Sequence, residues 1–123
     1  MRSSILLCCL LALAVTACKK EKETPKTYNL PGLWIGTYTT DQFPQNPPFY
    51  FSFIIKPDGN VLTEGKVSDG NTYYSKGTWT LTGDTLRCTY ISINFPNVNV
   101  TQSAKFVYNK TNGTLTNGTW RDE

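Results

Sequence analysis

The stretch YYSKGTWTLTGDTLRCTYISI, residues 73–93, decides the fold class of this chain. Apolar and polar side chains alternate on both sides of its central Gly83-Asp84 pair, and a period of two is typical of a β-strand with one buried face. The residues expected on that buried face are Trp79, Leu81, Leu86, Cys88 and Tyr90. Because Gly and Asp accept the backbone angles of a tight turn, the stretch predicts an antiparallel hairpin.

Similar runs, rich in β-branched and aromatic residues, lie on both sides of this hairpin and are separated by turn residues such as Pro57-Asp58-Gly59-Asn60. The expected strands are 33–39, 49–56, 61–67, 73–82, 85–93, 98–108 and 114–120, with an eighth if the run over 98–108 breaks near Ser103. Their short connections favour antiparallel neighbours, and closure removes exposed sheet edges. The sequence therefore predicts an all-β fold, a small antiparallel up-and-down β-barrel of seven or eight strands.

The aromatic content is the most informative feature for function, because the chain has 6 Phe, 7 Tyr and 3 Trp. Three interpretations stay open. In the first, the rings fill a solid barrel. In the second, part of the interior is open, and a small apolar pocket is lined by Phe51, Phe53, Trp79, Tyr90 and Phe106. In the third, an outer platform for a sugar or protein partner is formed by Tyr38, Tyr50, Tyr73 and Tyr74.

Two short motifs mark the ends of the barrel sequence. Gly32-Leu33-Trp34 opens the first strand, and Gly118-Thr119-Trp120-Arg121 closes the last. Together they resemble the lipocalin-like (calycin-type) arrangement, and the hairpin over 77–86 is similar to one found in lipocalin-like domains of small bacterial lipoproteins. The resemblance implies that Trp34 closes one end of the barrel and that Arg121 packs on its ring through a cation–π contact.

The N-terminal segment has the pattern of an export signal. Arg2 gives a positive start, and an apolar run over 5–15 is too short to span a bilayer. A plain signal peptide cleaved after A-x-A is one interpretation. Val15-Thr16-Ala17-Cys18, however, resembles a bacterial lipobox, which implies a cleaved lipoprotein signal peptide over 1–17 and lipidation of Cys18.

Residues 18–29 follow as a charged segment, expected to be a flexible tether between the lipid and a barrel domain over 30–123. Lys19 stands where an aspartate favours inner-membrane retention in bacterial lipoproteins, so the resemblance implies the outer membrane. The charged tether also resembles the surface-export signals of Bacteroidetes lipoproteins. The expected location is the bacterial cell envelope, with the membrane as a partner through Cys18 and with the leaflet left open.

Composition argues against several function classes. The chain has no histidine, which removes Ser-His-Asp triads, Cys-His dyads and His-ligated metal sites. From residue 28 onward, basic and acidic residues are equal in number, so the basic stripe of a nucleic-acid binder is missing. Cys88 is left as a lone cysteine and is expected to be buried and inert. We expect no catalytic residue, no metal, no cofactor and no nucleic-acid partner.

These observations lead to a functional prediction. We expect a lipid-anchored, non-catalytic envelope protein that binds a small apolar or amphipathic ligand inside the barrel. The alternative is an envelope protein–protein or glycan interaction module with a solid, side-chain-filled barrel. A cavity with room for a solute distinguishes the two interpretations, because only the first requires it.

The lipid anchor is testable by replacing its attachment atom. We expect Cys18→Ala to abolish lipid attachment and to leave an unprocessed precursor, because lipid transfer to the thiol precedes cleavage at a lipobox. Metabolic labelling with a fatty acid, combined with intact mass measurement of the purified chain, checks this. Normal cleavage of the Cys18→Ala chain would contradict the lipobox assignment and support the plain signal peptide.

Overall fold

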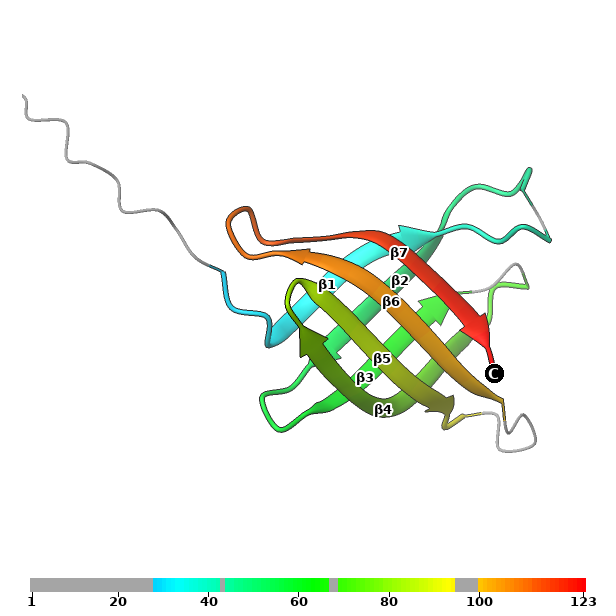
Figure 1. Ribbon diagram of the computed structural model, residues 1–123. Coiled ribbons are helices and arrows are strands. Elements are labelled where there is room, and N and C mark those ends of the chain that lie inside the picture. Colours follow the sequence, from blue (N-terminus) through cyan, green and yellow to red (C-terminus); the bar gives the residue numbers. More distant parts are fainter. Residues whose placement is uncertain (1–27, 43, 67–68, 95–99) are drawn as a thin grey trace, which may run out of the picture.

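The computed structural model describes residues 28–42, 44–66, 69–94 and 100–123 (Figure 1). The signal peptide expected over 1–17, the lipidation site Cys18 and the tether up to residue 27 lie outside these described residues. Within the described ranges, no helix is long and apolar enough to cross a membrane.

Seven β-strands make up one sheet whose order follows the chain, and every neighbouring pair is antiparallel. The strands are β1 (Gly32–Tyr38), β2 (Phe49–Ile55), β3 (Asn60–Lys66), β4 (Thr72–Thr82), β5 (Thr85–Ser92), β6 (Thr101–Asn109) and β7 (Thr114–Asp122). The predicted all-β, up-and-down antiparallel fold is confirmed, with strand bounds within a few residues of those expected.

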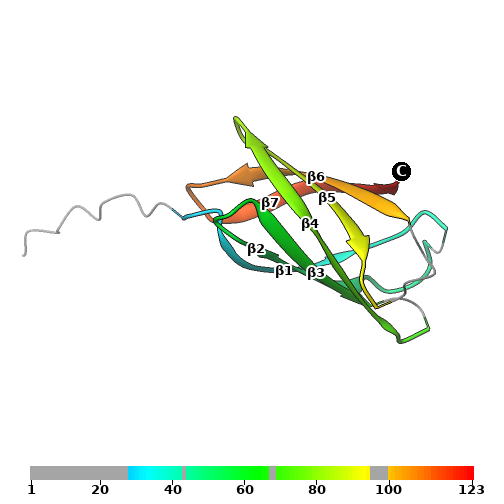
Figure 2. The same cartoon turned by 90° about the horizontal axis from the view of Figure 1, so that it is seen from below.

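The sheet curls into a half-barrel, so that its N-terminal half faces its C-terminal half (Figures 1 and 2). In the part of the chain that the structure describes, β1 and β7 are the two ends of the strand order, and no ladder joins them. The expected closure by hydrogen bonds is therefore replaced by an open seam. Tyr38 of β1 and Trp120 of β7 meet across this seam edge to face, with ring centroids 6.0 Å apart.

The core lies inside the curl, toward the end where β1 begins. Ile55, Val61, Leu86 and Cys88 are fully buried there, which agrees with the alternation expected for β2 and β5. Burial raises the pKa of the Cys88 thiol to about 12, so at neutral pH this cysteine stays protonated and unreactive.

Aromatic contacts connect the two halves of the sheet across the interior. Phe53 of β2 is buried and meets Phe106 of β6 edge to face at 5.0 Å between ring centroids, and Tyr90 of β5 at 6.4 Å. Near the start of β1, Trp34 meets Tyr108 of β6 in the same way at 5.9 Å. Such aromatic contacts stabilise the fold beyond the burial of apolar area. They maintain the curl of the sheet, because no backbone hydrogen bonds join β1 to β7 in the described part of the chain.

A close backbone approach bends the hairpin of β4 and β5. A Cβ atom at Gly77 would lie 1.9 Å from the carbonyl oxygen of Thr89 and 2.6 Å from the Cα of Tyr90. No side chain fits at that distance, so glycine is required where β4 turns across β5.

This requirement gives a test of the fold. We expect Gly77→Ala to lower the free energy of unfolding by about 3 kcal/mol, at the upper end of overpacking effects, because the obstructing atoms belong to backbone. Gly36→Ala is the matched control, since a Cβ there meets nothing within 4 Å. The control should change stability by no more than about 1 kcal/mol. Equal urea midpoints for the two variants would contradict the assignment.

Candidate functional site

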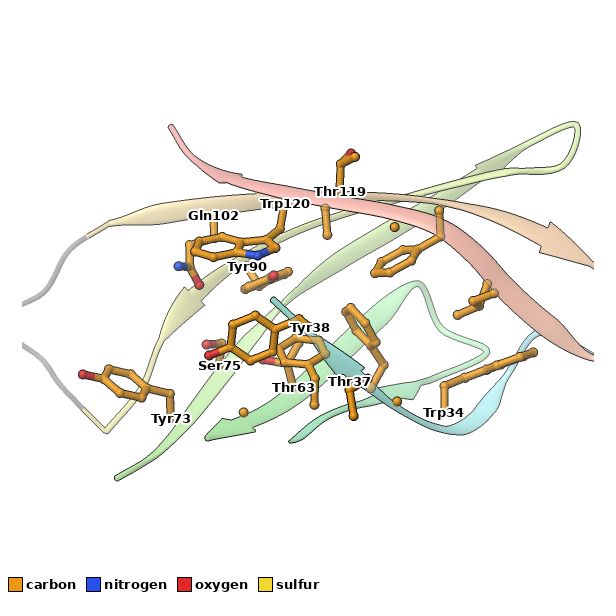
Figure 3. A pocket seen from close by; sticks show the side chains of 18 of the residues that line it. Trp34, Thr37, Tyr38, Thr63, Tyr73, Ser75, Tyr90, Gln102, Thr119 and Trp120 are labelled. Carbon is orange, nitrogen blue, oxygen red and sulfur yellow. The ribbon is translucent and has the colours of Figure 1, made fainter. Parts of the chain in front are cut away.

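An open cavity of about 900 Å³ occupies the half-barrel beyond the packed core. Residues from all seven strands line it, and it reaches the β1–β7 seam through Gly36, Thr37, Gly118 and Thr119. Figure 3 shows Tyr38, Tyr90 and Trp120, which come from three different strands, directed into the same space. The interior is therefore not filled by its own side chains, and there is room for a solute.

The aromatic wall of the cavity contains four of the five residues expected from the sequence, namely Phe51, Phe53, Tyr90 and Phe106. The structure places the fifth, Trp79, at the opposite end of the half-barrel. There its indole nitrogen donates a hydrogen bond of 2.8 Å to the carbonyl of Lys56, and its ring packs against the core. The alternation of side chains correctly placed Trp79 on the inner face of the sheet. It does not predict how far along the barrel axis a residue lies.

Glycines hold two of these rings in place. A Cβ at Gly65 would lie 2.9 Å from the ring of Phe51, and one at Gly118 would lie 2.6 Å from the ring of Phe106. Each ring thus packs directly against a glycine of a neighbouring strand, where a larger residue would collide with the ring. Gly36 faces the cavity with nothing within 4 Å of its Cβ position.

The lining at the mouth is polar. It includes Thr63, Ser75, Ser92, Gln102 and Asp122, together with Tyr38 of β1 and Tyr73 of β4. Gln102 donates a hydrogen bond of 2.9 Å to one carboxylate oxygen of Asp122. The hydroxyl oxygen of Ser92 is buried without a hydrogen-bond partner within the described ranges. A polar ligand group has hydrogen-bonding atoms available here.

Two of the four tyrosines expected on an outer platform line the cavity instead. Tyr38 donates a hydrogen bond of 2.7 Å to the carbonyl of Lys66 and lies beside Trp120, and Tyr73 belongs to the lining at the mouth. Burial, and secondly the proximity of Tyr73, raise the pKa of Tyr38. The Tyr38 ring therefore contributes neutral, polarisable surface to the interior.

Tyr90 lies at the junction of the aromatic wall and the polar mouth. Its pKa is raised mainly by burial, with smaller contributions from Cys88, Asp122 and Tyr38. Its side chain is buried and lines the cavity. Tyr90 therefore presents an uncharged phenol to a ligand in the cavity.

The structure does not bring Trp34 and Arg121 together, which corrects the role implied by the lipocalin-like resemblance. The indole nitrogen of Trp34 donates a hydrogen bond of 2.7 Å to the carbonyl of Leu30, and its ring meets Tyr108. Arg121 lies near the other end of β7, where its side chain is 75% exposed and pairs with Glu123 at 3.1 Å. Tyr108 takes the place expected for the cation.

A β-bulge in β7 explains why Arg121 points outward. Lys105 pairs with Thr119 but Val107 pairs with Thr116, so two residues of β7 oppose Phe106 alone. Asn117 adopts the left-handed conformation, with φ of 51°, that such a bulge requires. Strict alternation from Leu115 would turn Arg121 inward, whereas the extra residue turns Trp120 and Asp122 into the cavity. The Asn117-Gly118 pair was the signal in the sequence, since both residues accept positive φ.

In the ranges that the structure describes, no group of three or more His, Cys, Asp or Glu side chains is placed to hold a metal ion. Comparison with known proteins gave no match to any family model, curated protein or solved structure.

The revised roles of Trp34 and Arg121 give a direct test. We expect Trp34→Ala to destabilise the fold by about 2 kcal/mol or more, because a half-buried indole, its hydrogen bond and its contact with Tyr108 are all lost. Arg121→Ala should leave the thermal midpoint essentially unchanged, since an exposed ion pair contributes little. Comparable losses for the two variants, measured by thermal unfolding, would restore the cation–π arrangement.

Proposed function

We propose that this chain is a lipid-anchored envelope protein whose half-barrel binds a small amphipathic ligand without chemical change. The observation that carries the proposal is the open cavity of about 900 Å³, with an aromatic wall at one end and polar groups at the other. Its volume lies in the range of small-molecule sites, about 300–1,000 Å³.

The distribution of chemistry along the cavity supports an amphipathic ligand. The rings of Phe51, Phe53 and Phe106 would cover an apolar body, and burial of apolar area supplies the main binding free energy. Tyr90, Ser92 and Gln102 would hydrogen-bond the polar end, which fixes the orientation of the ligand.

The absence of histidine and the burial of Cys88 support a binding role without catalysis. The chain contains no histidine, and Cys88 is buried with its thiol pKa raised to about 12. Neither general-base activation nor a reactive thiolate is therefore available from these groups. Anchoring through Cys18 rests on the lipobox-like residues 15–18, and the tether would leave the half-barrel close to the membrane surface.

A second candidate function is favoured by the outer face of β1 and β2. Leu33 and Ile54 do not line the cavity and are 62% and 45% exposed, and Ile35, at the seam edge of the cavity, is 67% exposed. They lie on neighbouring strands, with Leu33 directly opposite Ile54, beside an edge strand. Aliphatic surface next to an unpaired edge is a feature of partner-binding sites, and it supports the envelope interaction module as the alternative.

Ligand binding is testable with residues 18–123 carrying Cys18→Ser, so that no acyl chain is attached. Native mass spectrometry of this chain, purified gently from a bacterial host, should show an adduct that is lost on denaturation. The neutral amphipathic dye N-phenyl-1-naphthylamine should bind with saturable fluorescence enhancement. We expect Gly36→Leu to weaken dye binding about tenfold, because its side chain fills the cavity at a position free of contacts.

Thr116→Leu is the matched control, because Thr116 is an exposed position on the other edge strand and does not line the cavity. Dye affinity of this variant should equal that of the parent chain. Equal affinities for the parent and Gly36→Leu would contradict binding inside the half-barrel. In that case, dye binding abolished by Leu33→Ser would favour the outer face of β1 and β2, because Leu33 is exposed and does not line the cavity.

A further inference from the structure

The charge of the described cavity lining is negative. Among the described lining residues, Asp122 is the charged side chain, and none is Lys or Arg. The described lining therefore offers a ligand a carboxylate and no cation.

Register places this carboxylate among aromatic rings. Tyr90 pairs with Gln102 and Gln102 pairs with Asp122, so the three form a row across β5, β6 and β7 on the inner face. Trp120 lies two residues before Asp122 on the same face, and Tyr38 meets the Trp120 ring from across the seam. Figure 3 shows Tyr38, Tyr90 and Trp120 around one space next to Gln102.

The nearest cation along the chain is held outside this row. Arg121 points to the outer face and pairs with Glu123 at 3.1 Å, while the hydroxyl of Ser103 donates a hydrogen bond to the same carboxylate oxygen. Asp122 receives only the Gln102 amide on one of its oxygens within the described ranges. Among the described residues, no Lys or Arg forms an ion pair with this carboxylate.

We infer that the mouth of the cavity selects a ligand with a positively charged head, such as an alkylammonium group, through the rings of Tyr38, Tyr90 and Trp120 and the carboxylate of Asp122. This inference rests on the proposed ligand-binding function and narrows its ligand class. Ring faces attract cations through the aromatic quadrupole, most strongly for Trp and Tyr. Trp120 is 43% exposed, so its ring is accessible to a ligand.

An anionic head would meet the opposite conditions at the same place. A carboxylate next to Asp122 would experience like-charge repulsion, and no Lys or Arg of the described lining would compensate for its lost hydration. A neutral head would keep the hydrogen bonds to Tyr90 and Gln102 without either charge effect. Head charge, at constant chain length, therefore separates the three ligand classes.

The experiment compares decyltrimethylammonium, decanoate and decyl β-glucoside, each below its critical micelle concentration, with residues 18–123 carrying Cys18→Ser. Circular dichroism first checks that each chain is folded, and isothermal titration calorimetry then gives the dissociation constants. We expect decyltrimethylammonium to bind about tenfold more tightly than decanoate, with the glucoside between them. Asp122→Asn should reduce the ratio of cation to anion affinity at least threefold and leave the glucoside unchanged.

Glu123→Gln is the matched control, because it removes the same charge one residue away on the outer face and should leave the ratio unaltered. Decanoate binding as tightly as decyltrimethylammonium would overturn the inference and keep the proposed function. An affinity ratio that falls equally in Asp122→Asn and Glu123→Gln would overturn it as well, because the preference would then be a general surface effect. Absence of binding by all three compounds would overturn both the inference and the proposed function.

Discussion

The contacts of Phe53 across the interior are the interaction on which the rest of the structure depends. A closed barrel is held by hydrogen bonds around its whole circumference, but here no ladder joins β1 to β7 in the described part of the chain. The curl must therefore be maintained by side chains that reach from one half of the sheet to the other. Phe53 does this at the centre, where it meets Tyr90 and Phe106, and Trp34 with Tyr108 does it at the closed end.

The same rings determine how much space remains. Bulky side chains gather at the closed end, where Ile55, Val61 and Leu86 are at most 1% exposed. Farther along, the rings of Phe51 and Phe106 pack directly against the glycines at 65 and 118. Buried apolar packing is thus concentrated at one end of the half-barrel, and the open end is left with polar and aromatic groups, among which the Ser92 hydroxyl has no hydrogen-bond partner in the described part of the chain.

Much of the fold could be predicted from the sequence, because strands, turns and buried faces depend on local alternation and on residues such as Gly83-Asp84. The strand set, the antiparallel order and the inward faces of β2, β5 and β6 follow from that periodicity. Other features depend on the pairing register between neighbouring strands, which cannot be predicted from the pattern within one strand. Strand register determines that Trp79 lies at the closed end of the half-barrel and that Tyr38 lies on the inner face. The bulge in β7 determines that Arg121 lies on the outer face.

The bulge at Asn117-Gly118 has a consequence for how such a chain diverges. Two adjacent residues of opposite charge, Arg121 and Asp122, follow it on alternate faces of β7. Loss of one codon at the bulge would exchange them, so that the guanidinium would enter the cavity and the carboxylate would leave it. The charge preference proposed for the site would therefore depend on strand length as well as on residue identity, and a single in-frame deletion would reverse it without any substitution.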